Sequence, residues 1–333
     1  SLNLYQKKSL IILTMNNFIF KVLRAGINTT YQDKGRYGLQ HIGVTPGGCM
    51  DQMSFLIANA LVGNSNNIGV IEFAYQGPLL QLIKGKIKIA ITGNVYFKII
   101  NLNNDIIVGE CNRTYNLNEG DKIDILATNK SAYGYLSIEG GFNIETFYNS
   151  VSTLVKANIG PNNGSKIKVG DKIIINKNRK NEKNFITSAS STNNNIIRVL
   201  KGPQYDYFSD ESKKIFFSQP YKISNLTDRM GARLEGQVLK NIVNTNIRSE
   251  GITKGAIQVP GDGQPIILLT DYPTIGGYPK IANVITADYD LLVQKKPGDK
   301  IFFKFVELHE AELLYKKQFN IISEIIKNIK ELN

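Results

Sequence analysis

The chain has 333 residues, of which 42% are hydrophobic and 20% are charged, and its formal net charge is +12. This length and composition are typical of a soluble globular protein with a substantial core and room for two domains. The positive charge invites a nucleic-acid-binding function, but the lysines are scattered and form no arginine-rich stripe, so we expect no nucleic-acid partner.

Targeting, redox and metal signals are weak. No apolar run approaches the roughly 20 residues that span a bilayer, and Leu10–Leu13 is too short for a signal peptide, so we expect a cytoplasmic protein with no membrane partner. Residues 1–14 resemble an extension before a second start at Met15. Two cysteines, Cys49 and Cys111, form no disulfide framework, and no His or Cys spacing indicates a metal site.

The first half of the chain is predicted to consist mainly of strands and turns. Phe18–Leu23 alternates like a strand, and the segments 29–38 and 43–51 are loops in which glycine permits close backbone approach. Ser54–Val62 has the pattern of a helix that ends at Gly63. From 86 to 176, short apolar runs alternate with turns, which is typical of barrels or sandwiches.

One tripeptide precedes a strand-like run three times. Gly-Asp-Lys occurs at 120–122, 170–172 and 298–300, and an apolar run follows each copy. Glycine supplies the turn, and aspartate can bond to the neighbouring backbone before the strand begins. We therefore expect the same turn in both halves of the chain.

A polar segment separates the two halves. Residues 177–195 are of low complexity and are the predicted linker. The run at 196–203 echoes the first strand at 20–26, which suggests two related β lobes. We therefore expect an N-terminal β lobe over residues 15–190 and a C-terminal β lobe over residues 196–333.

The second half is organised around residues 255–288. Ala256–Val259 and Ile266–Leu269 are predicted to be buried strands joined by a tight turn. Gly276-Gly277 is expected to make a second turn before a strand at Ile281–Ile285. Polar groups inside this apolar frame need partners if they are buried, namely Gln258, Asp271, Tyr278 and Asp288. Beyond the frame, residues 306–332 have helical spacing and predict a C-terminal helix.

Motifs that identify a family occur along the chain in a fixed order. They read VLRAGINTTYQDKGRYG, GVTPGGCMDQMSFLIANALVGN, IEFAYQGP, TDRMGARLEG, SEGITKGAIQVPGDGQPIILL, TIGGYPKIANVITAD and QKKPGDKIFF. With these motifs the chain resembles, from roughly Phe18 to Phe305, the family variously called the C subunit of 5-oxoprolinase, KipA-like and allophanate hydrolase subunit 2. The resemblance implies a mainly β fold of two cyclophilin-like β-barrel lobes with a few short helices.

The resemblance also implies a function. It implies the C subunit of an ATP-dependent 5-oxoprolinase, which opens 5-oxoproline to glutamate, with a KipI-like B subunit and a third subunit as partners and ATP used by the complex. Two alternatives stay open: a carboxyltransferase component of a urea amidolyase or urea carboxylase system, and a regulatory KipA-like protein that modulates a sensor kinase. No Met-Lys dipeptide occurs, so we expect no covalent biotin on this chain. Pro273 and Cys49 depart from residues common in the family, which leaves the exact substrate open.

Either reaction develops negative charge on oxygen, which Arg, Lys or N–H donors stabilise. Arg36 and Arg229 lie in matching motifs and are expected to clamp a carboxylate or phosphate. The expected catalytic residues are Asp33, Arg36, Asp51, Asp228, Arg229 and Gln258, and the expected substrate-binding residues are Lys254, Gly276, Gly277 and Tyr278. A structural role is the alternative for each, because an aspartate beside an arginine is more often an ion pair and two glycines are often a hairpin turn.

Overall fold

The computed structural model describes residues 18–176, 182–189 and 194–332. The expected N-terminal extension and the second start at Met15 lie outside these residues. Within them, the chain divides into two compact units. The first takes its residues from Ser1–Asp33, Ser54–Ser188 and Ile326–Asn333, and the second from Lys34–Met53 and Ala189–Ile325. These units differ from a division near residue 190 at two places, since Lys34–Met53 belongs to the second unit and the C-terminal residues belong to the first.

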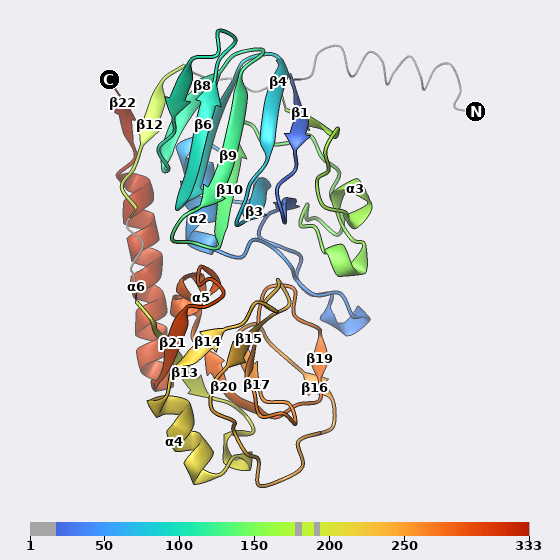
Figure 1. Ribbon diagram of the computed structural model, residues 1–333, viewed down its shortest axis with the longest axis vertical. Coiled ribbons are helices and arrows are strands. Elements are labelled where there is room, and N and C mark those ends of the chain that lie inside the picture. Colours follow the sequence, from blue (N-terminus) through green and yellow to red (C-terminus); the bar gives the residue numbers. More distant parts are fainter. Residues whose placement is uncertain (1–17, 177–181, 190–193, 333) are drawn as a thin grey trace, which may run out of the picture. The chain divides into compact units, whose positions relative to one another are not determined.

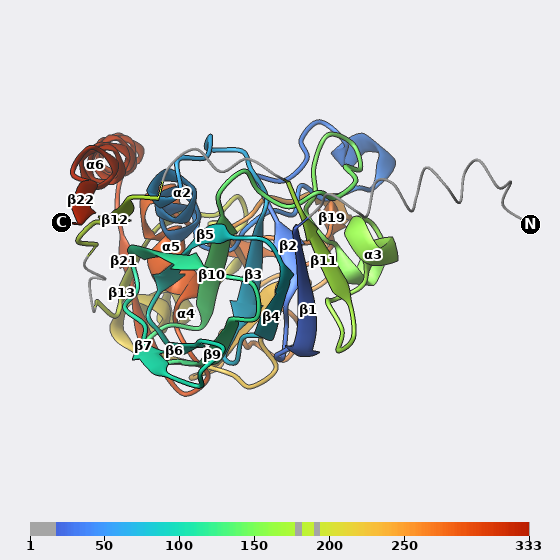
Figure 2. The same cartoon turned by 90° about the horizontal axis from the view of Figure 1, so that it is seen from above.

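The first unit is built from two β-sheets that face each other as layers (Figure 2). In spatial order, one sheet contains β11 (Lys172–Ile175), β1 (Phe18–Arg24), β4 (Leu79–Lys84), β9 (Lys122–Thr128), β6 (Val95–Ile100) and β7 (Ile106–Val108). The other contains β2 (Thr30–Gln32), β3 (Val70–Ala74), β10 (Tyr133–Ile138), β5 (Ile87–Gly93), β8 (Arg113–Leu117), β12 (Asn184–Ile186) and β22 (Lys330–Leu332).

The two sheets enclose one hydrophobic core. Phe20 and Ile123 from the first sheet and Ile89 and Leu136 from the second are fully buried in the same cluster. Alternate residues of a strand point to one face, so the apolar residues of β1 and β9 can line the core while their polar neighbours lie outside. This accounts for the short alternating runs of the sequence.

The second unit is a closed barrel of seven strands (Figure 1). Around the barrel they are β13 (Ile196–Lys201), β20 (Lys280–Val284), β17 (Ala256–Gln258), β18 (Ile266–Leu268), β15 (Gly231–Glu235), β14 (Tyr221–Ile223) and β21 (Lys300–Phe305). β13 and β21 pair in parallel and the other neighbours pair antiparallel. A two-stranded sheet of β16 (Glu250–Gly251) and β19 (Ile275–Gly276) completes the strands of this unit.

The helices are few, and the predicted mainly β fold is confirmed. They are α2 (Gln52–Leu61), α3 (Pro161–Gly164), α4 (Asp210–Ser218), α5 (Thr286–Val293) and α6 (Leu308–Lys327) together with the 3₁₀ helices Gln40–Ile42, Val155–Ala157 and Tyr205–Tyr207. The helices predicted from residues 54–62 and 306–332 correspond to α2 and α6. Among the described residues, no helix combines the length and apolar character that crossing a membrane requires.

The three Gly-Asp-Lys copies form the same turn, as predicted. Asp121, Asp171 and Asp299 each accept a hydrogen bond from the backbone N–H three residues earlier, at 2.8 Å in every case. The glycine before each aspartate has φ between +90° and +96°, which favours glycine. The turns lead into β9, β11 and β21, so the same turn precedes a strand in both units.

Two predictions for the second half need correction. Gly276 is not part of a plain turn, because it lies in β19 and pairs with Glu250 of β16. The polar segment predicted as a linker contains strand β12, which pairs with β8 and β22; its residues 177–181 and 190–193 lie outside the described part of the chain. The strands predicted around the tight turn are confirmed as the antiparallel pair β17 and β18.

Candidate active site

Lys34–Met53 brings two glycine-rich loops of the sequence together within the second unit. The Arg36 N–H donates to the Pro46 carbonyl at 2.8 Å. Gly35 and Gly48 have φ of +88° and +99°, and a Cβ on Gly35 would lie 2.7 Å from the Pro46 carbonyl oxygen. Only glycine fits such a crossing of two backbones. The crossing fixes the loop that carries Cys49 and Asp51.

This loop contributes Cys49 and Asp51 to a set of ionisable and polar groups, which we call the lysine–aspartate cluster. It comprises Cys49, Asp51, Lys254, Tyr289, Asp290 and Gln294, all in the second unit. The carboxylate of Asp290, in α5, accepts hydrogen bonds from the backbone N–H groups of Gln52 at 2.9 Å and Met53 at 3.1 Å, and from Nε2 of Gln318 at 3.3 Å. Those bonds hold the Asp290 carboxyl at the first two residues of α2.

The second carboxylate of the cluster is Asp51. It is 4% exposed, and its Oδ2 accepts a hydrogen bond from Nε2 of Gln294 at 2.7 Å. Burial, and after it the negative charge of Asp51, raises the pKa of the Asp290 carboxyl to about 7. Two carboxylates that repel each other in an enclosed site share protons, which is how acid and base roles arise at neutral pH.

The cation of the cluster is Lys254. Its Nζ lies 4.2 Å from the centroid of the Tyr289 ring. The Tyr289 hydroxyl is in turn within 2.8 Å of the Thr270 hydroxyl, which fixes the ring. Burial lowers the pKa of the Lys254 ammonium, and the charges of Asp290 and Cys49 oppose that shift. Burial thus acts on both groups, lowering the pKa of Lys254 and raising that of Asp290.

Arg229 contacts a different carboxylate from the one expected. Its Nε and one terminal nitrogen bind the two oxygens of Asp271 at 2.8 and 2.9 Å, and the same terminal nitrogen donates to the Gly48 carbonyl at 2.6 Å. Asp228 is exposed and accepts hydrogen bonds from the N–H groups of Met230 and Gly231 at the start of β15. Arg229 thus ties the barrel to the loop of the lysine–aspartate cluster.

The two remaining expected residues near the N-terminus are both buried. Arg36 is 2% exposed and belongs to the second unit. Asp33 is 7% exposed and belongs to the first unit, where its carboxylate accepts hydrogen bonds from the Ser150 hydroxyl at 2.6 Å and the Val151 N–H at 2.8 Å. These bonds join Asp33, just after β2, to the distant segment at Ser150 and Val151.

Gln258 lies in a second polar group, which we call the β17–β20 cluster, made of Gln204, Glu250, Gln258, Gly276 and Lys280. Gln258 pairs with Lys280 across β17 and β20, and Gly276 pairs with Glu250 across the two-stranded sheet. Lys280 forms an ion pair with Glu250, whose pKa is lowered by the hydrogen bond with Lys280 and by Gln204. Gln258 Nε2 is buried, and a Cβ on Gly276 would lie 2.5 Å from it.

The other two expected substrate-binding residues lie on the strand-to-strand connection after β19. The Gly277 carbonyl accepts a hydrogen bond from the Ile247 N–H at 2.9 Å. The Tyr278 side chain is 40% exposed. The structure thus places Lys254 and Asp51 together in one cluster, and Gln258 and Gly276 together in the other.

Sequence reasoning missed several residues of both clusters, namely Gln204, Glu250, Lys280, Tyr289, Asp290 and Gln294. Asp290 and Gln294 are four residues apart, which places them on one face of a helix beginning near Thr286. From that spacing, the two side chains could have been predicted to lie together. Glu250 and Lys280 could not be paired from the sequence, because they are 30 residues apart and lie in different sheets, Glu250 in the two-stranded sheet and Lys280 in the barrel. Within the described residues, no group of three or more His, Cys, Asp and Glu side chains is arranged to hold a metal ion.

Comparison with known proteins gives relatives across nearly the whole chain. The family described as carboxyltransferase domain, subdomain A and B, matches residues 42–305. The C subunit of 5-oxoprolinase from Escherichia coli K12 is 32% identical over 298 residues, which are 88% of this chain and 93% of that protein. The C subunit of 5-oxoprolinase from Haemophilus influenzae is 33% identical over 312 residues, covering 94% of this chain and 99% of that protein.

A solved structure confirms the fold. The crystal structure of the Kluyveromyces lactis urea amidolyase superimposes with a TM-score of 0.83 at 29% identity, over 92% of this chain. The matched region is 20% of that larger chain. The relatives therefore include proteins of this length as well as a carboxyltransferase region within a much longer enzyme.

Proposed function

The chain belongs to the carboxyltransferase-domain family that includes the C subunit of 5-oxoprolinase, and from this membership we propose that it is the C subunit of an ATP-dependent 5-oxoprolinase. The named relatives match it over 93% and 99% of their length, which supports the same role for the whole chain. The partners would be a KipI-like B subunit and a third subunit. The observation that supports a catalytic role is the lysine–aspartate cluster, in which burial raises the pKa of Asp290 and lowers that of Lys254.

The reaction requires a proton at one particular atom. Hydrolysis of 5-oxoproline breaks the bond between the lactam carbonyl carbon and the ring nitrogen, forms a bond from that carbon to a water oxygen, and places a proton on the nitrogen. A protonated acid near the nitrogen lowers the barrier to its departure. Lys254 would donate this proton, and Asp290, protonated near neutral pH, would restore it to Lys254.

The remaining groups of the cluster would support this pair. Asp51 keeps a negative charge beside Asp290 and thereby favours the protonated form of that carboxyl. Arg229 fixes the Gly48 carbonyl, and through it the loop that bears Asp51. Backbone and side-chain hydrogen bonds of this kind keep acid and base groups at working distance. The sequence has no GxxxxGK[ST] phosphate loop, so ATP would bind with groups of the partner subunits.

A second candidate is the carboxyltransferase of a urea amidolyase system. The TM-score of 0.83 with the K. lactis urea amidolyase favours it. In that reaction a carboxyl group moves from carboxybiotin to a urea nitrogen, which must lose a proton. The same Lys254 and Asp290 could accept that proton. Biotin would have to arrive on another chain, because the sequence lacks a Met-Lys attachment context.

The experiment that separates these candidates is reconstitution. The chain is co-expressed with its B-type partner and the third subunit, and glutamate formed from 5-oxoproline is measured with and without ATP. We expect ATP-dependent glutamate formation in the wild-type complex. Lys254→Met should lower kcat about 100-fold or more, the range of a lost general acid.

Lys222→Met is the matched control, because its side chain is 53% exposed on β14. It should leave the rate unchanged. The second candidate would be favoured over the first if the wild-type complex formed no glutamate from 5-oxoproline but transferred a carboxyl group from carboxybiotin to urea. A Lys254→Met complex with wild-type kcat would exclude Lys254 from either reaction.

A further inference from the structure

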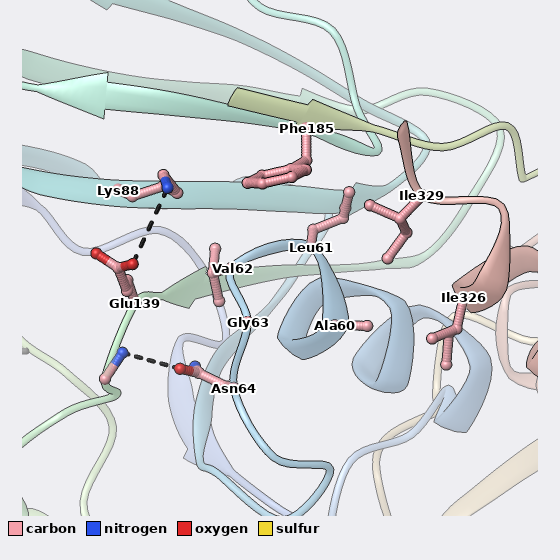
Figure 3. Close-up of a pocket in the computed structure, with 11 residues that line it drawn as sticks. Ala60, Leu61, Val62, Gly63, Asn64, Lys88, Glu139, Phe185, Ile326 and Ile329 are labelled. Atoms are coloured by element: carbon pink, nitrogen blue, oxygen red, sulfur yellow. Dashed lines mark hydrogen bonds and ion pairs between the residues drawn. The ribbon is translucent and has the colours of Figure 1, made fainter. Parts of the chain in front are cut away.

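The first unit contains a cavity that the proposed reaction does not use. Its volume is about 400 Å³, within the range typical of small-molecule sites. Figure 3 shows it between the end of α2, strands β5 and β12, and the end of α6. The side chains of Leu61, Lys88, Glu139, Phe185, Ile326 and Ile329 line it.

One side of the cavity is charged. The Lys88 side chain is 2% exposed, and its Nζ lies 3.9 Å from Oε1 of Glu139, which is 11% exposed. At that separation the two groups form an ion pair without a direct hydrogen bond, and their opposite charges lie side by side at one end of the cavity. The Lys88 Nζ also lies 5.4 Å from the centroid of the Phe185 ring, which forms the adjoining wall.

The other side of the cavity is apolar. In Figure 3 the side chains of Leu61, Ile326 and Ile329 lie across from the charged pair, with Phe185 between them. An apolar group placed there would leave water and contact hydrocarbon on several sides. A ligand that fits must therefore carry both charges at one end and an apolar body at the other.

We propose that this cavity binds a free α-amino acid with an apolar side chain, such as leucine. Its carboxylate binds the Lys88 ammonium, its ammonium binds the Glu139 carboxylate, and its side chain packs against Leu61, Phe185 and Ile329. A zwitterion matches a site whose two charges sum to zero, whereas a simple carboxylate would face repulsion from Glu139 and a simple amine would face repulsion from Lys88. This inference does not depend on the proposed reaction.

The test compares three ligands that share the isobutyl group of leucine, on the full chain. Calorimetric titration is done with L-leucine, 4-methylpentanoate and 3-methylbutylamine. We expect leucine to bind at least 10-fold more tightly than either singly charged analogue. Binding of 4-methylpentanoate as tightly as leucine, or no binding of leucine at millimolar concentration, would overturn the proposal.

Variants locate the binding. Lys88→Met and Glu139→Gln should each weaken leucine binding at least 10-fold, while Lys172→Met, an exposed lysine on β11, should leave it unchanged. Because a buried lysine can be needed for folding, thermal unfolding of each variant is followed in parallel, and Glu139→Gln preserves the shape of the side chain. Unchanged leucine affinity in folded Glu139→Gln would place the amino acid elsewhere and reject the site.

Discussion

Arg229 illustrates how a single residue acquires a role that its neighbours in sequence do not reveal. The adjacent Asp228 would suggest a local pair, but the guanidinium binds Asp271, 42 residues away, through two bonds. Both side chains are enclosed, at 14% and 13% exposure. Breaking an enclosed ion pair on one side leaves an uncompensated charge, which costs more than the pair itself contributes.

Asp271→Asn should therefore destabilise the second unit by about 3 kcal/mol, the lower end for loss of one partner of a buried pair. Urea unfolding followed by fluorescence and circular dichroism measures this change. Arg229→Met, combined with Asp271→Asn in a double-mutant cycle, should show a coupling of about 1 kcal/mol or more. Additive effects of the two changes would mean that the pair contributes nothing.

The raised pKa of Asp290 predicts how the stability of the folded chain depends on pH. Its pKa is about 7 in the folded chain, above the value of about 3.9 for a free aspartate, so the folded chain binds this proton more tightly. The stability that the protonated carboxyl contributes is fully present below about pH 4 and is lost as the pH rises to about 7. Asp290→Asn cannot titrate, so this part of the pH dependence should vanish.

Unfolding free energies of the wild type and Asp290→Asn at a series of pH values between 4 and 8 test this expectation. The wild type should lose stability relative to the variant as the pH rises. Asp262→Asn, at an exposed turn, is the control and should follow the wild type. Parallel curves for wild type and Asp290→Asn would show that Asp290 has an ordinary pKa.

At the scale of elements, the crossing of Lys34–Gly35 with Gly47–Gly48 positions the loop that carries Cys49 and Asp51 of the lysine–aspartate cluster. Gly35→Ala would place a Cβ 2.7 Å from the Pro46 carbonyl oxygen at a φ of +88°. Gly38 has a similar φ of +81° but has no atom within 4 Å of an added Cβ. Gly38→Ala therefore carries the conformational cost alone, about 1 kcal/mol, and Gly35→Ala carries a steric cost as well.

We expect Gly35→Ala to lower both the unfolding free energy and the rate of the reconstituted complex more than Gly38→Ala does. Urea unfolding and the glutamate assay measure the two effects. Equal losses in the two variants would mean that the crossing relaxes without consequence for the loop. Such a result would remove the link between this crossing and the cluster.

At the scale of the molecule, local patterns in the sequence predicted local structure well. The apolar runs of β17 and β18, the three Gly-Asp-Lys turns and the helical spacing of α6 are all set by neighbouring residues, and the elements they predict were found. The predicted C-terminal helix is shorter than expected, because α6 ends at Lys327 and Lys330–Leu332 forms strand β22. Strand β12 was missed because its three residues carry a single strongly apolar pair in a polar segment. The strand forms because its backbone pairs with β8 and β22, which its own sequence does not indicate.

The candidate site could be predicted only in part. Lys254 and Asp51 stand in family motifs, and the structure brings both into the lysine–aspartate cluster. Asp290 stands just beyond the motif that ends at Asp288, and its raised pKa comes from burial and from Asp51, neither of which a linear pattern contains. Long-range pairings such as Glu250 with Lys280 join the two-stranded sheet to a strand of the barrel, and no linear pattern contains them.

The central claim is that the pair Lys254 and Asp290 delivers a proton during lactam opening. The pH dependence of kcat in the reconstituted complex tests it most directly, with wild type and Asp290→Asn compared between pH 5 and 9. We predict that the wild-type kcat falls as the pH rises through about 7, where Asp290 loses its proton, and that Asp290→Asn has a lower kcat without this decline. The same decline near pH 7 in both enzymes would contradict the account.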